Sequence, residues 1–142
     1  MRTSIRTIAA LCTVGLGLSA CGSSDDTTTE PDAVEASIGW TNVADGDEIT
    51  SPFTAEFAAV GLTVEPAGEV KEGAGHFHVM IDTPCVAAGE VVPNDETHRH
   101  FGDGSTSAVL ELEAGQHTLC LQFADGVHVA TDYTAAIDVT VS

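Results

Sequence analysis

The stretch Gly75-His76-Phe77-His78-Val79-Met80-Ile81-Asp82 alternates apolar side chains with imidazole and thioether side chains. In an extended strand, successive side chains point to opposite faces. The odd positions from 77 to 81 then form one apolar face, which predicts a strand packed on a hydrophobic core. The opposite face carries His76, His78 and Met80, so the strand is predicted to hold two imidazoles side by side.

Alternating patterns of the same kind recur on both sides of this strand. Turn signals such as Asp45-Gly46 and Asp125-Gly126 separate them. No stretch has a convincing helical period, and no internal repeat is present. We therefore predict an all-β chain folded as an antiparallel β-sandwich. The expected strands include residues 38–40, 53–57, 61–64, 108–112, 117–123 and 137–141.

Two segments, Asp45–Pro52 and Ala114–Leu119, resemble immunoglobulin-like domains of bacterial surface proteins. This resemblance implies an immunoglobulin-like sandwich and names no function. The folded part is expected to comprise residues 37–142, a length that supports one core and not two.

The first twenty residues have the features of an export signal. Arg2 and Arg6 precede an apolar stretch from Ile8 to Leu18, which is too short to span a bilayer by itself. The ending Leu18-Ser19-Ala20-Cys21 resembles the lipobox of bacterial lipoproteins, which implies cleavage before Cys21 and lipid on that residue. The alternative is an ordinary signal peptide. We predict an extracytoplasmic protein that is lipid-anchored to the bacterial cell membrane or envelope.

Residues 21–36 are rich in Ser, Thr, Asp and Glu and have almost no bulky apolar side chain, which predicts a disordered stalk. The whole chain carries a formal net charge of −18, from 22 acidic and four basic residues. Such a charge repels nucleic acid and favours cations or basic partners. The alternative is that the acidity only maintains solubility.

Cleavage before Cys21 would leave three cysteines, of which lipid would occupy the first. In an oxidising compartment the remaining pair, Cys85 and Cys120, is expected to form a disulfide. Two buried free thiols are the alternative, and no Cys-x-x-Cys spacing supports a cysteine metal site.

Four of the six histidines form two His-x-His pairs, and imidazole nitrogen is a preferred ligand of zinc and copper. One Zn or Cu ion could therefore bind to a cluster of His76, His78, His98 and His100, with the second pair supplied by a loop. The alternative is a polar structural network. The other two histidines are expected to be structural, with His128 only capping the turn before it.

The wider histidine region resembles an uncharacterised bacterial family of secreted domains of unknown function. The family signature is Gly-His-His-His-Leu-Leu-Ile-Asp, then Pro-x-Asp-Glu-x-His-x-His-Phe-Gly-x-Gly-Gln-Thr, then Gly-x-His-Thr-Leu. This chain differs at Phe77 and at Ser105. The resemblance implies the fold and export, and names no reaction. It rests on Gly75–Asp82, Gly89–Glu96, His98 and His100–Thr106.

Three functions remain open at this stage. The first is metal binding, and the second is a non-catalytic module that binds protein or glycan, with structural histidines. The third is a metalloenzyme like copper–zinc superoxide dismutase. It is disfavoured because the motif here is Gly-His-Phe-His and not Gly-Phe-His-x-His, and because the acidic charge would repel superoxide. Hydrolase motifs such as Gly-x-Ser-x-Gly and His-Glu-x-x-His are absent. We therefore expect a protein that is not an enzyme.

Overall fold

The computed structural model describes residues 34–142, which form nine β-strands. The described residues contain no helix, and hence none long and apolar enough to cross a membrane. Cys21, the predicted signal peptide and most of the predicted stalk lie outside the described residues. The strands are β1 (Ser37–Trp40), β2 (Glu48–Ile49), β3 (Phe53–Val60), β4 (Thr63–Val64), β5 (Ala74–Ile81), β6 (His98–His100), β7 (Ser107–Leu110), β8 (Gly115–Ala124) and β9 (Ala130–Val141).

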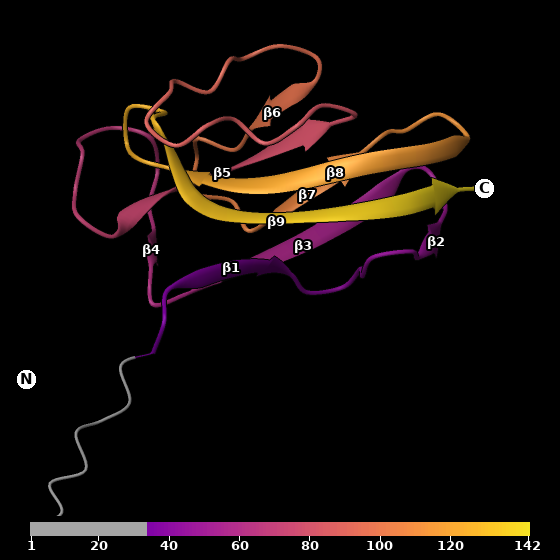
Figure 1. The fold of residues 1–142 in the computed structure, drawn as a ribbon, viewed down its shortest axis with the longest axis horizontal. Helices are drawn as coiled ribbons and strands as arrows, with labels where there is room; N and C mark the ends of the chain where they lie inside the picture. Colours follow the sequence, from indigo (N-terminus) through magenta and orange to yellow (C-terminus); the bar gives the residue numbers. More distant parts are fainter. Residues whose placement is uncertain (1–33) are drawn as a thin grey trace, which may run out of the picture. The chain divides into compact units, whose positions relative to one another are not determined.

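The strands form two sheets that face each other. One sheet has the order β1-β3-β7, and the other has the order β2-β9-β8-β5-β4, with β6 paired to β5. Most pairs are antiparallel, whereas β2–β9 and β4–β5 are parallel. Figure 1 shows β1 and β3 in one layer, opposite β8 and β9 in the other. The predicted all-β sandwich is therefore confirmed, and its immunoglobulin-like type remains a prediction.

The hydrophobic core lies between the two sheets, and one face of β5 contributes to it. Phe77 and Val79 are fully buried, and the ring of Phe77 lies 4.8 Å from that of Phe57 on β3 and 5.4 Å from that of Phe123 on β8, centroid to centroid. Burying one such aromatic side chain stabilises the fold by roughly 2–3 kcal/mol. The alternation predicted for this strand is thus confirmed on its apolar side.

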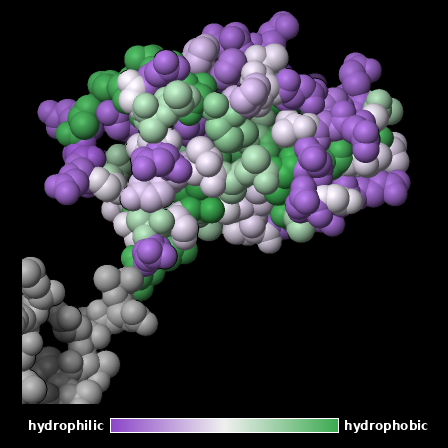
Figure 2. Space-filling view, viewed as in Figure 1, coloured by the Kyte–Doolittle hydropathy of each residue, from purple (hydrophilic) through white to green (hydrophobic). Residues whose placement is uncertain are grey.

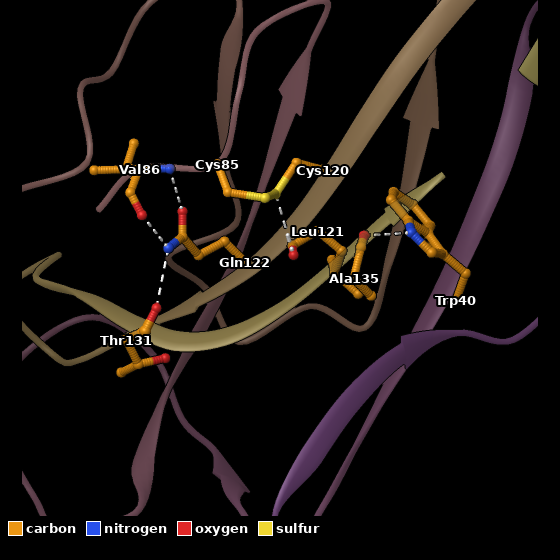
Figure 3. The surroundings of a disulfide bond; sticks show 8 residues. All are labelled: Trp40, Cys85, Val86, Cys120, Leu121, Gln122, Thr131 and Ala135. Atoms are coloured by element: carbon orange, nitrogen blue, oxygen red, sulfur yellow. Dashed lines mark hydrogen bonds between the residues drawn. A yellow bond between two sulfur atoms is a disulfide. The ribbon is translucent and has the colours of Figure 1, made fainter. Parts of the chain in front are cut away.

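The other face of β5 is also covered, by the long segment that joins β5 to β6 and runs over this side of the sheet (Figure 1). The predicted disulfide between Cys85 and Cys120 is present and ties this segment to β8, with a Cα–Cα distance of 5.6 Å. Beside it, the Gln122 side chain accepts a hydrogen bond from the Val86 N–H and donates to the Val86 and Thr131 carbonyls (Figure 3). The cover is therefore held both covalently and by a buried amide.

The second His-x-His pair lies on strand β6 and not on the loop that the sequence predicted. The edge of β5 is shared along its length, because β4 pairs with residues 74 and 75 and β6 pairs with residues 78–80. In this register His78 lies opposite His100, and Met80 lies opposite His98. Long-range pairing thus brings the two histidine pairs side by side.

The visible face of the domain carries both hydrophilic and hydrophobic residues (Figure 2). Figure 2 shows hydrophilic residues gathered at the ends of the visible face, with paler and more hydrophobic residues between them. Several valines are exposed singly on different elements, which is normal for a soluble domain. They include Val60, Val70, Val91, Val109 and Val127.

Candidate metal centre

Four imidazoles meet on the face of β5 that points away from the core. The Nε2 atom of His76 lies 3.1 Å from Nε2 of His78 and 3.1 Å from Nε2 of His100. Nε2 of His128 lies 3.0 Å from Nε2 of His100. These four residues form the histidine cluster, and their Nε2 atoms follow one another in the order 78, 76, 100, 128.

Three separate parts of the chain supply the cluster. Strand β5 places His76 and His78 on one face because they are two residues apart. The register of β6 puts His100 directly opposite His78. The register of β8 puts Ala124 opposite His76, so the hairpin that follows β8 turns back beside His76 and carries His128.

The hairpin from residue 125 to residue 129 is held by its own hydrogen bonds. The Asp125 carboxylate accepts from the N–H groups of Val127 and Val129. His128 has a left-handed backbone, with φ of 71°, and its carbonyl accepts from the Val92 N–H at 2.9 Å. A non-glycine residue in this region is uncommon and is retained where surrounding contacts determine it. Here those contacts direct the ring toward His100.

The cluster is buried on one side and reaches the surface on the other. His76 and His78 are 0% and 1% exposed, whereas His100 and His128 are partly exposed. The sequence did not predict this burial, because it placed the first pair on a face outside the core. The rings of His100, from β6, and His128, from the hairpin after β8, pack against His76 and His78 and contribute to this burial.

Burial favours the neutral form of three of these histidines, His76, His78 and His100. Desolvation, followed by the charges of His100 and His128, lowers the pKa of His76 from 6.5 to about 4. Desolvation, followed by the charge of His76, lowers the pKa of His78 to about 3. Burial also lowers the pKa of His100. Neutral imidazole is the form that binds a metal ion, so the lowered pKa values of His76, His78 and His100 favour their ligand form at neutral pH.

Hydrogen bonding alone cannot satisfy the cluster. Each Nε2 of a neutral imidazole carries either one hydrogen or one lone pair. The atoms of His76 and His100 each contact two neighbours, so each would have to share that one hydrogen or lone pair between two partners. In addition, the buried Nδ1 atoms of His76 and His78 have no hydrogen-bond partner among the described residues. Buried polar groups in this state are rare. They are Nδ1 atoms, however, and an ion bound at the Nε2 atoms would leave them unpaired.

The spacing of the nitrogens suits a transition metal ion. Two nitrogens bound to one tetrahedral zinc ion lie roughly 3.3 Å apart, close to the observed 3.0–3.1 Å. The ligand atoms of His76, His100 and His128 all lie within 4.8 Å of one another. His78 is close to His76 and supplies a fourth nitrogen at the buried end. The arrangement thus offers three convergent nitrogen ligands and a fourth beside them.

The structure brings together three of the four predicted ligands and separates the fourth. His98 turns to Asp95, whose carboxylate lies 2.8 Å from its Nδ1, and the Thr97 hydroxyl lies 3.1 Å from the same atom. His128 replaces it in the cluster, so the expectation that His128 only caps a turn is wrong. His128 comes just after β8, the strand that pairs with β5. This pairing cannot be read from the sequence, so His128 could not be assigned to the cluster from sequence alone.

His117 has a structural position, as the sequence predicted. Its Nδ1 lies 2.7 Å from the Asp82 carboxylate, and its Nε2 lies 2.9 Å from the Glu113 carbonyl. Both partners are acceptors, so these contacts favour the protonated ring, in which both nitrogens donate. The Glu113 carbonyl and the Asp82 carboxylate accordingly raise the pKa of His117.

A family model described as "Domain of unknown function (DUF4399)" matches residues 55–142. The chain belongs to this family. The DUF4399 match covers every member of the histidine cluster and both cysteines of the disulfide, whereas β1 and β2 precede it. Membership of a family of unknown function, as the sequence predicted, is thus established. No curated protein and no solved structure matches the chain significantly.

Proposed function

We propose that this protein binds one transition metal ion, zinc or copper, through His76, His100 and His128, with His78 beside them at the buried end of the cluster. The observation that carries the proposal is the chain of Nε2–Nε2 contacts of 3.0–3.1 Å. A cation can accept the lone pairs of the three convergent nitrogens, those of His76, His100 and His128, at once, whereas hydrogen bonding leaves some of them unsatisfied.

Three further features support the proposal. Imidazole nitrogens suit zinc and copper better than they suit calcium or magnesium. The lowered pKa values keep His76 and His78 free of protons that would compete with the ion. The acidic chain, with a net charge of −18, raises the local concentration of cations. The proposed activity is binding, without a catalysed reaction.

The test is calorimetric titration of chelator-treated protein with Zn(II) and Cu(II), together with elemental analysis. We expect one ion per chain. Replacement of His100 by alanine should weaken binding strongly, because the central nitrogen of the cluster is lost. The matched control is His98→Ala, on the same strand and face but outside the cluster, which should bind as the unsubstituted protein does. Absence of saturable binding, or equal losses in both variants, would refute the proposal.

We also propose that the protein acts outside the cytoplasm, anchored by lipid at Cys21. The Leu-Ser-Ala-Cys ending supports this location. So does the Cys85–Cys120 disulfide, because disulfides persist mainly in oxidising compartments. A metal site at the cell surface would then be in contact with ions from the environment.

A further inference from the structure

Gly102 follows His100 by two residues, at the point where the chain leaves β6. A Cβ atom built on Gly102 would overlap the Cε1 and Nε2 atoms of the His100 ring. On the same side it would lie 3.4 Å from the Cβ of Ala67. The His100 imidazole therefore occupies the space that any side chain at position 102 would need.

We infer that Gly102 is a positioning residue of the histidine cluster, required because a side chain there would displace the ligating nitrogen of His100. This inference rests on the proposed function. It assigns to Gly102 a role in metal affinity, apart from any role in folding. The reason is that His100 Nε2 contacts both His76 and His128, so its displacement interrupts the middle of the cluster.

The backbone around Gly102 is held by hydrogen bonds, whereas the His100 ring can rotate about its side-chain bonds. The Gly102 carbonyl accepts a hydrogen bond from the Ala67 N–H at 2.9 Å. The preceding residue, Phe101, donates its N–H to the Phe77 carbonyl at 3.1 Å. The His100 ring is the end of a flexible side chain that is partly exposed. An alanine at position 102 would therefore rotate the ring out of the cluster and leave the strand in place.

Gly126 shows the contrasting case. A Cβ there would overlap the carbonyl oxygen of Glu69, and the Gly68 N–H donates to the Gly126 carbonyl at 2.8 Å. The atoms nearest to such a Cβ belong to the backbone of Glu69 and Gly68, which can move only if the fold itself changes. Gly126→Ala should accordingly destabilise the protein, whereas Gly102→Ala should leave it folded and change the metal site.

The experiment measures Cu(II) affinity and the visible and electron paramagnetic resonance spectra of bound Cu(II) for the full chain and its Gly102→Ala variant. We expect the variant to bind about 10- to 100-fold more weakly, the loss typical of a mispositioned ligand. Its spectra should move toward those of His100→Ala. Its melting temperature without metal should stay close to that of the unsubstituted protein. The matched control is Gly68→Ala, where a Cβ meets nothing within 4 Å.

A double variant distinguishes an effect of Gly102 that acts through His100 from an effect on the fold as a whole. Once His100 is alanine, adding Gly102→Ala should cost no further affinity, because the two changes act on the same nitrogen. Equal affinity and spectra in Gly102→Ala and the unsubstituted protein would overturn the inference alone. So would additive losses in the double variant, or a Gly102→Ala chain that does not fold. An unsubstituted protein that binds no metal would overturn the proposed function and this inference together.

Discussion

Without metal, the protein should lose stability as the pH falls from 6.5 toward 4. In the folded state burial lowers the pKa of His76 to about 4 and that of His78 to about 3. In the unfolded chain both return to the ordinary value near 6.5. The unfolded chain therefore binds protons first. The stability that these histidines contribute is fully present above pH 6.5 and is lost as the pH approaches their folded pKa values.

The size of the loss follows from the number of protons. One proton bound only by the unfolded chain lowers the free energy of unfolding by about 1.4 kcal/mol per pH unit. Two such histidines, titrating from 6.5, give a loss of roughly 3 kcal/mol between pH 6.5 and pH 5. A typical domain is stable by only about 5–15 kcal/mol, so the change is large.

His100, whose pKa is also lowered by burial, adds to the loss within this interval, whereas the other shifted groups act outside it. The lowered pKa values of Asp95 and Asp103 arise mainly from side-chain hydrogen bonds to His98 and Ser105, respectively. They affect stability only as the pH falls below about 4, where free carboxyl groups take up protons. The raised pKa of His117 affects stability above pH 6.5. The interval from pH 6.5 to 5 thus reports mainly on the histidine cluster.

The assay is urea unfolding of chelator-treated protein at pH 6.5, 6.0, 5.5 and 5.0, followed by the fluorescence of Trp40. A His78→Gln variant removes one titrating group and should lose clearly less stability over the same interval, while His76 and His100 still contribute. Unfolding free energies that stay constant or rise between pH 6.5 and 5 would show that the cluster is not held neutral. An undiminished slope in His78→Gln would refute the assignment to this pair.

Three other predictions can be checked separately. His117 should contribute about 1 kcal/mol below pH 6.5, lost as the pH rises through its raised pKa, because its cation donates to Asp82 and to a carbonyl. Urea unfolding of His117→Ala should therefore show a smaller decline between pH 6.5 and 9 than the unsubstituted protein. Replacing Cys85 and Cys120 together by alanine should cost roughly 3–4 kcal/mol, because their disulfide closes a loop with a sequence separation of 35; unchanged denaturant midpoints would contradict this. Cys21→Ser should release the protein from the membrane fraction or leave it unprocessed, and an unchanged distribution and mass would exclude lipid at this residue.

The sequence predicted the local features of the site and missed those that depend on pairing between distant strands. The period of two around His78 is local, so both faces of β5 could be assigned from sequence alone. The disulfide followed from counting cysteines. The exchange of His98 for His128 could not be predicted, because it depends on the register of β8 and on hydrogen bonds that hold Asp95 against His98. Burial of the cluster depends likewise on rings from β6 and from the hairpin after β8, which pairing between distant strands brings together.

Strand β5 has no solvent-facing side over residues 75–80, all of which are buried. A slip of one residue in its pairing would exchange the two faces completely. It would place imidazoles in the phenylalanine layer of the core and place Phe77 among the remaining histidines. In a strand with one solvent-exposed face, a register slip disrupts only the packing of the core. In β5 it would also abolish the histidine cluster. Alternative registers of β5 are thus disfavoured by both of its faces, and the pairing of β5 within the sheet fixes the geometry of His76 and His78.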